Sequence, residues 1–406
     1  MRLSINQGSA RVGNVEIHDM FRVTELDAGH VTTTKQGNVL SESAVAFAFS
    51  QTSVHAIEKD LAIVVPCMNE ARDILDGVLR GVPHDVLIIL VSNSSEANFE
   101  SESQLLETIC HDTGRVSVVV HQQSSGLAQA LLCAGMSALV EPNGPTYRVR
   151  NGKGEAMMIG TAFAKLSNKR FVGFIDADNL VAGSVHEYCK VYAAGLHYAL
   201  YQTNTDNPYA MVRIKWNSKP KVRDNELVFE KSGRSSRVVN HWMNRLLNSL
   251  TDTGKQDIIQ TANAGEHAMS VDLALQLHFA SGYAVEPFQL VDAWERLAAQ
   301  DRAVQILQIE TRNPHFHDCG KGDGHIKRMQ AGGLSTVYHS PLTPQNLKAE
   351  LKEFCKESLA DAVDVEGTPG KSTVYPPLRT MDFDVFREGL EARAGVVAAG
   401  GVVGSR

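Results

Sequence analysis

Between residues 60 and 195, short apolar runs alternate with segments of helical periodicity, and this alternation constrains the fold more than any other feature. Four runs rich in β-branched residues are expected to form buried strands, at 61–66, 86–91, 116–120 and 170–175. Helices are expected at 70–80, 100–111, 126–139, 155–166 and 184–194. Strands that alternate with helices pair in parallel and carry helices on both faces. Ligands of such α/β sheets bind beyond the carboxyl ends of the strands.

The regular alternation stops after residue 204. Strands are expected at 209–216, 226–230 and 304–310, the first two long and antiparallel, and helices at 238–250, 264–279 and 346–362. Weak strand patterns occur at 15–17 and 21–26. We therefore expect an N-terminal extension with short strands, a Rossmann-like half, a mixed-sheet half, and a C-terminal helix with a poorly ordered tail. Their bounds are 1–59, 60–204, 205–345 and 346–406.

The chain carries 39 basic and 46 acidic side chains, which gives a net charge of −7. Such a chain is not expected to bind nucleic acid irrespective of sequence. No apolar run reaches the roughly 20 residues of a membrane-spanning helix, and the first residues lack the apolar core of a secretory signal. The six cysteines contain no Cys-x-x-Cys pair, which favours reduced thiols. We therefore expect a cytoplasmic protein without membrane or nucleic-acid partners.

Two aspartates, Asp176 and Asp178, follow the apolar run at 170–175. Carboxylates two residues apart at a strand end lie on the same side and can face a divalent cation or a hydroxylated ligand. The alternative is a strand-end turn with solvated acids. The rigid apolar flank favours the binding site.

Two basic segments precede expected helices. In the first, Gly152, Lys153 and Gly154 suit a phosphate or pyrophosphate, because glycine allows close backbone approach and a helix N-terminus favours anions. The second combines small and hydroxyl residues with arginines and suits a second anion. Its residues are Gly233, Arg234, Ser235, Ser236 and Arg237, with Arg213 and Lys215 from an earlier strand. The alternatives are an ordinary basic turn and a solvated basic face.

A late pair of histidines, His315 and His317, can share one face of an extended chain. Imidazole together with the carboxylate of Asp318 suits Mg²⁺, Mn²⁺ or Zn²⁺, although a polar loop without a metal would have the same composition. Glu266 is a candidate for acid–base work or for binding sugar hydroxyl groups, and a plain helix cap at Asn263 is the alternative.

Seven long motifs occur in the order found in one enzyme family. They are IVVPCMNE, GVPHDVLIILVSNS, YRVRNGKGEAMMIG, VGFIDADN, GRSSRVVNHWMN, TANAGEHAM and NPHFHD. Over roughly residues 15–339 the chain thus resembles the mannosyl-3-phosphoglycerate synthases. The resemblance implies a GT-A glycosyltransferase fold and transfer of mannose from GDP-mannose to the 2-hydroxyl group of 3-phosphoglycerate with retention, in mannosylglycerate biosynthesis. It also implies a tendency to form dimers.

The resemblance also implies roles for individual residues. Asp178, supported by Asp176, would bind Mg²⁺ (or Mn²⁺ or Co²⁺), with His315 or His317 completing the shell. The residues expected to hold the nucleotide sugar are Pro66, Met68, Asn69, Glu70, Asn93, Gly152, Lys153, Gly154, Asp176 and Ala177. The acceptor would bind at residues 233–237, with help from Arg213 or Lys215.

Retention at the anomeric carbon leaves two routes open. A double displacement would need Glu266 as the nucleophile, whereas in a front-face route Glu266 would orient the mannose. Three alternatives to the mannosyl transfer remain, which are a glucosyl-3-phosphoglycerate synthase, a sugar-1-phosphate nucleotidyltransferase and an inactive metabolite sensor. A nucleotidyltransferase would carry its glycine-rich loop directly after the first strand, where residues 66–70 lie here.

Overall fold

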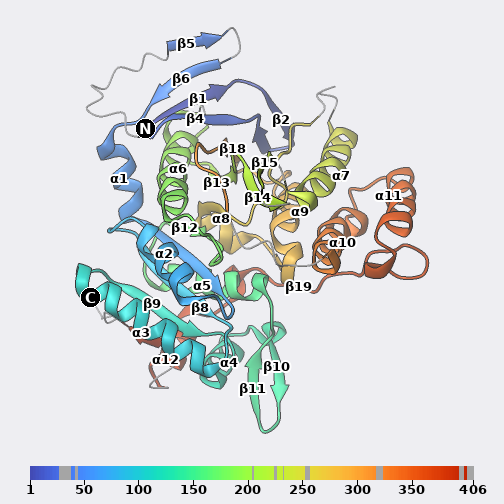
Figure 1. The fold of residues 1–406 in the computed structure, drawn as a ribbon. Coiled ribbons are helices and arrows are strands. Elements are labelled where there is room, and N and C mark those ends of the chain that lie inside the picture. Colours follow the sequence, from blue (N-terminus) through green and yellow to red (C-terminus); the bar gives the residue numbers. More distant parts are fainter. Residues whose placement is uncertain are drawn as a thin grey trace.

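The computed structural model describes residues 1–26, 38–41, 44–203, 205–223, 226–231, 233–251, 257–316, 323–392 and 397–399. One large mixed sheet runs through this part of the chain, and helices cover both faces (Figure 1). The expected α/β class is thereby confirmed. Within the described residues, no helix is long and apolar enough to cross a membrane.

The main sheet follows the order β20-β9-β8-β7-β12-β16-β13-β18-β4-β1-β6-β5, with β3 beside β18 and β2 beside β3. Its strands are β1 Arg2–Asn6, β2 Ser9–Val12, β3 Val15–His18, β4 Phe21–Glu25, β5 Asn38–Ser41, β6 Ala44–Ala48, β7 Leu61–Cys67, β8 Leu87–Ser92, β9 Ser117–His121, β12 Phe171–Phe174, β13 Tyr209–Lys215, β16 His267–Ser270, β18 Val304–Glu310 and β20 Val397–Ala399. Three separate pairs are β10 Val140–Asn143 with β11 Thr146–Val149, β14 Lys219–Arg223 with β15 Glu226–Glu230, and β17 Phe279–Ala280 with β19 Val374–Tyr375.

The four parallel strands expected from the sequence form the contiguous block β9-β8-β7-β12. Residues along β7 alternate between two cores, since Ala62 and Val64 face one side while Ile63 and Val65 face the other. The helices are α1 Gln51–Lys59, α2 Arg72–Gly81, α3 Glu96–Thr113, α4 Ser125–Cys133, α5 Lys153–Leu166, α6 Ala182–Tyr201, α7 Arg234–Leu250, α8 Val271–Gln276, α9 Val285–Arg296, α10 Asp323–His339, α11 Gln345–Ser358 and α12 Phe383–Glu391. Helices α1, α2, α3 and α6 cover one face, and α4, α5 and α7–α12 cover the other.

Several local expectations were wrong. The helix expected at 264–279 is strand β16 followed by the short helix α8, because a strand buried on both faces shows no polar alternation. Strand β13 runs parallel to β18 and antiparallel only to β16. Between the helices expected at 126–139 and 155–166, where no strand was expected, the chain forms the hairpin β10–β11.

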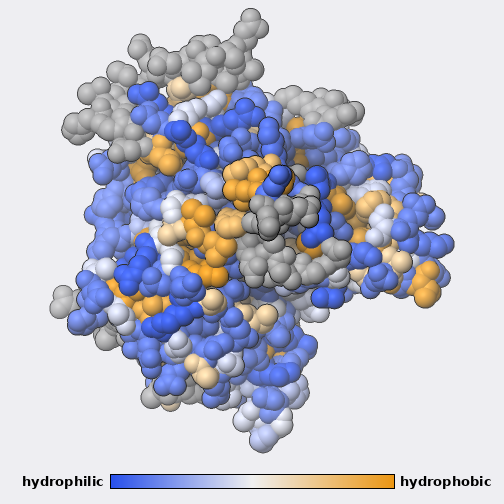
Figure 2. Space-filling model, in the orientation of Figure 1, coloured by the Kyte–Doolittle hydropathy of each residue, from blue (hydrophilic) through white to orange (hydrophobic). Residues whose placement is uncertain are grey.

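Both ends of the chain contribute strands to the main sheet, including the short strands expected near the N-terminus. Strands β1–β6 extend the main sheet beyond β18, and β20 pairs with β9 at the opposite edge. The rest of the tail expected to be poorly ordered, at 393–396 and 400–406, lies outside the described residues. On the face of the molecule that Figure 2 shows, hydrophilic side chains predominate and apolar ones gather in a few areas near the centre.

Candidate functional site

The aspartate pair lies where the sequence placed it, just beyond β12. Strand β12 pairs in parallel with β7 and antiparallel with β16. As a result the end of β12, the end of β7 and the beginning of β16 meet at one edge of the sheet. Asp176, Asp178 and the residues that follow β7 line a common cavity of about 760 Å³.

Lys153, the first residue of α5, forms an ion-pair network at the floor of this cavity. Its Nζ lies 2.5 Å from Asp176 Oδ1 and 2.7 Å from Glu286 Oε1. Burial lowers the pKa of Lys153, but the two carboxylates outweigh burial and hold the pKa well above its ordinary value. Glu286, on α9, is 5% exposed and was not expected from the sequence. Its position in an ordinary helix gives no signal of the site.

A glycine allows this network to form. A Cβ atom on Gly265 would lie 2.5 Å from Asp176 Oδ2 and 3.0 Å from Lys153 Nζ. Gly154 was expected near the pyrophosphate but does not line the cavity. A Cβ on it would lie 2.0 Å from the carbonyl oxygen of Ala280, so this glycine permits close packing of α5.

The turn after β7 forms the other end of the cavity, with Pro66, Met68 and Glu70 in its lining. Asn69 was expected to hold the nucleotide sugar, but it is not among the residues that line the cavity, and Ala71 is the N-cap residue of α2. Asn69 has a φ of 59° and holds the turn instead. Its amide N–H donates to Ser94 Oγ (2.7 Å) and its Oδ1 accepts a bond from the amide of Ser95 (3.0 Å).

Asn93, at the end of β8, lines the same end of the cavity. Its Nδ2 donates to Asn151 Oδ1, and its Oδ1 accepts a bond from Gln123 Nε2 (2.9 Å). The turn after β7, the end of β8 and the glycine-rich segment are thereby tied together.

His315, from the second half of the chain, also lines the larger cavity. Its ring stacks on Trp216 with 4.2 Å between centroids, and its Nδ1 lies 3.3 Å from the Tyr188 hydroxyl group. Carboxylates with one imidazole form a donor set that fits Mg²⁺ or Mn²⁺. Within the described residues, however, no three His, Cys, Asp or Glu side chains are already grouped as a metal site. His317 lies outside the described residues.

Glu266 is fully buried immediately before β16 and lines neither cavity described here. Its Oε1 lies 3.8 Å from His315 Nδ1. Burial, reinforced by the charge of Asp176, raises the pKa of Glu266 to about 8. The Glu266 carboxyl group is therefore separated from both cavities, and it adjoins the larger one through His315.

The basic segment at 233–237, which was expected to bind the acceptor, is divided between two adjoining cavities. Arg234 and Ser235 line the larger cavity, and Arg237 lines a smaller one of about 410 Å³. Gly233 and Ser236 line both.

Arg213 lies outside both cavities, contrary to expectation. It is fully buried, and its guanidinium group donates to the carbonyl oxygens of Thr261 (3.0 Å), Ala262 (2.9 Å) and Glu286 (3.0 Å). Burial lowers the pKa of Arg213 to about 10. Arg213 therefore fixes the backbone on two sides of the site.

Comparison with known proteins agrees with the motifs. A family model described as mannosyl-3-phosphoglycerate synthase matches residues 5–390. The mannosyl-3-phosphoglycerate synthase of Pyrococcus furiosus is 34% identical over 93% of this chain and 94% of its own, and that of Aeropyrum pernix is 31% identical over 95% and 96%. A crystal structure of glucosyl-3-phosphoglycerate synthase from Mycobacterium tuberculosis, in complex with Mn²⁺, UDP and glucosyl-3-phosphoglycerate, is 18% identical. It has a TM-score of 0.48 and covers 82% of this chain and 97% of that chain.

Proposed function

The chain belongs to the mannosyl-3-phosphoglycerate synthase family, and from this membership we propose that it transfers mannose from GDP-mannose to the 2-hydroxyl group of 3-phosphoglycerate. One observation supports the proposal above others. A single cavity joins the turn after β7, the aspartate pair with Lys153, and the basic start of α7. A nucleotide sugar and a small anionic acceptor can thus lie end to end.

The nucleotide would occupy the end lined by Pro66, Met68, Glu70 and Asn93, as expected for a GT-A fold. Asp178, with Asp176 in support, and His315 would hold a divalent cation, which when bound neutralises the negative charge developing on the leaving GDP. Lys153 is already paired with two carboxylates, so it contributes to this end of the site mainly by positioning Asp176.

The acceptor would bind at the start of α7. The N-cap residue Gly233 has no side chain that could cap the helix, and a helix N-terminus favours a phosphate or carboxylate. Arg234 and the hydroxyl groups of Ser235 and Ser236 line the larger cavity at the same place.

The geometry favours the front-face route over double displacement. Glu266 is fully buried and lines neither cavity, whereas a nucleophile must reach the anomeric carbon. Substitution Glu266→Gln tests the route. We expect reduced transfer and no mannosyl-enzyme adduct on the wild type, and trapping such an adduct would overturn the front-face proposal.

The activity is tested by measuring GDP release from GDP-mannose and Mg²⁺, with and without 3-phosphoglycerate. We expect release that depends on the acceptor. Equal or faster release from GDP-glucose would favour the glucosyl enzyme, and turnover of GTP with mannose 1-phosphate would favour a nucleotidyltransferase. The cytoplasmic location and the homodimer remain predictions.

The metal assignment is tested with Asp178→Ala. We expect loss of metal-dependent transfer by at least about 100-fold, with an unchanged circular dichroism spectrum. Asp272→Ala, at a side chain that is 63% exposed and away from the cavity, is the control. Full activity in Asp178→Ala would refute the assignment.

A further inference from the structure

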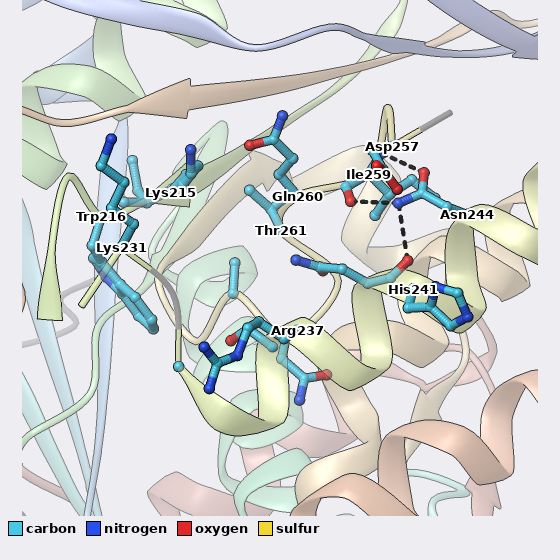
Figure 3. A pocket seen from close by; sticks show the side chains of 16 residues that line it. Lys215, Trp216, Lys231, Arg237, His241, Asn244, Asp257, Ile259, Gln260 and Thr261 are labelled. Carbon is cyan, nitrogen blue, oxygen red and sulfur yellow. Dashed lines mark hydrogen bonds between the residues drawn. The ribbon is translucent and has the colours of Figure 1, made fainter. Parts of the chain in front are cut away.

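The smaller cavity is a separate, preformed recess beside the acceptor segment. Figure 3 shows Lys215, Trp216 and Lys231 on one side of the cavity and Arg237 and His241, on α7, below it. Asp257, Ile259, Gln260 and Thr261 lie above. Its volume of about 410 Å³ suits a molecule the size of a phosphorylated three-carbon acid. It is small for a nucleotide sugar.

The charge around this cavity is positive, although the whole chain is acidic. Lys215, Lys231 and Arg237 all line it, and Asp257 is the one carboxylate in its lining among the described residues. Glu310 neutralises Lys215 at 2.6 Å. Within the described part of the chain, Lys231 and Arg237 are paired with no carboxylate, so their charges remain available to an anion.

The wall of the cavity is held by hydrogen bonds that need no ligand. Asn244 Nδ2 donates to the carbonyl oxygen of Ile259 (2.8 Å), and the amide of Ile259 donates back to Asn244 Oδ1 (2.7 Å). Asn240 Oδ1 accepts a bond from the amide of Ala262 (2.9 Å). The segment 259–262 is thereby fixed against α7, and a ligand would not have to order it.

The partition between the two cavities connects the smaller one to the proposed chemistry. Trp216, Gly233, Ser236 and Asn263 line both cavities. The ring of Trp216 stacks on His315, and Lys219 Nζ lies 4.0 Å from the centre of the same ring. An anion in the smaller cavity would therefore contact the partition that also positions the acceptor segment.

We propose that the smaller cavity is a second binding site for a small phosphorylated carboxylic acid, distinct from the acceptor site, and that its occupancy modulates use of the acceptor. The binding part of this inference stands independently, whereas the modulation rests on the proposed function. A phosphate would contact Lys231 and Arg237. It would also contact Gly233 and Ser236, which line both cavities.

Calorimetric titration of the full chain with 3-phosphoglycerate, in the absence of donor, tests the binding. We expect two sites per chain. Lys231→Glu reverses a charge only in the smaller cavity and should weaken one site at least about tenfold. Arg234→Ala, in the larger cavity, should weaken the other. A single site that Arg234→Ala abolishes and Lys231→Glu leaves intact would overturn the proposal.

Steady-state kinetics tests the modulation. Inorganic phosphate is added at saturating GDP-mannose, and it should change the KM for 3-phosphoglycerate in the wild type but not in Lys231→Glu. If Lys231→Glu alone raises that KM as strongly as Arg234→Ala does, the smaller cavity belongs to the acceptor site and the second-site proposal fails. If two sites bind but no transfer occurs with any donor, the proposed function fails while the binding inference stands.

Discussion

At the scale of single residues, the pairing of Lys153 with both Asp176 and Glu286 carries the sharpest prediction. Substitution Glu286→Gln removes one of two carboxylate charges that balance the ammonium group of Lys153, whose side chain is 16% exposed. We expect a loss of transition-state stabilisation of about 1–3 kcal/mol, because Gln keeps an acceptor atom but not the charge. The measurement is kcat/KM for GDP-mannose.

Glu295→Gln is the matched control for that prediction. Glu295 lies on the same helix, α9, but accepts a bond from Ser340 Oγ (2.6 Å) away from the cavity. We expect its kcat/KM to equal that of the wild type. Equal losses in the two variants would mean that the effect comes from α9 as a whole and not from Lys153.

His267 gives a prediction on stability against pH. Burial, aided by the charge of Arg213, holds its pKa well below the ordinary value. Below about pH 6.5, His267 therefore binds a proton in the unfolded chain but not in the folded chain. The free energy of unfolding should therefore fall as the pH decreases below this value. His267 contributes up to about 1.4 kcal/mol of this loss per pH unit. Urea unfolding between pH 7.5 and 5 should show a smaller slope for His267→Phe, and an unchanged slope would contradict the assignment.

Sequence motifs could place candidate site residues at strand ends, but not residues that reach the site through tertiary contacts. Asp176, Asp178 and the turn after β7 follow apolar runs, and the sheet brings such positions together whatever the rest of the chain does. Glu286 and the smaller cavity depend on where α9 and α7 pack, which no local pattern encodes. Arg213 was misassigned because a buried arginine bound to carbonyl oxygens has the same local sequence as one that binds an anion.

At the scale of elements, the packing of α5 on the sheet depends on Gly160. A Cβ there would lie 2.3 Å from Val64 Cγ1 on β7. We predict that Gly160→Ala lowers the free energy of unfolding by about 1–3 kcal/mol through overpacking.

Gly183→Ala, in the first turn of α6, is the control because nothing lies within 4 Å of its Cβ. We expect it to be neutral or to stabilise by up to about 1 kcal/mol. Chemical denaturation of both variants provides the comparison, and a Gly160→Ala variant as stable as Gly183→Ala would show that α5 can shift without cost.

The sequence correctly predicted the elements of the parallel block, where turn signals separate strands from helices, and also β13, β15, β18 and most of α7. Strand β16 could not be recognised because its four residues are buried on both faces and continue directly into α8. Strands β1 and β6 are short and pair with partners far away in the chain, so their existence depends on the sheet edge that β18 and β4 provide.

At the scale of the whole molecule, the sheet joins the expected nucleotide half and acceptor half through the pairing of β12 with β16. Both buried cores contain residues from both halves. We therefore predict a single cooperative unfolding transition. Trp216, Trp242 and Trp294 all lie after residue 204, so their fluorescence reports on the second half, whereas far-ultraviolet circular dichroism reports on the whole chain. Non-coincident transitions would contradict the prediction.

The direction of β16 has a consequence for how such a chain can diversify. Because β16 runs against β12 and β13, its beginning faces the cavity, and residues 257–265 lead into the site from that end. Apart from Gly265 and the residues hydrogen-bonded to α7, this segment can change composition without shifting the register of the strands that carry the aspartate pair. Directed evolution of acceptor range should therefore concentrate its substitutions there and leave the turn after β7 unchanged.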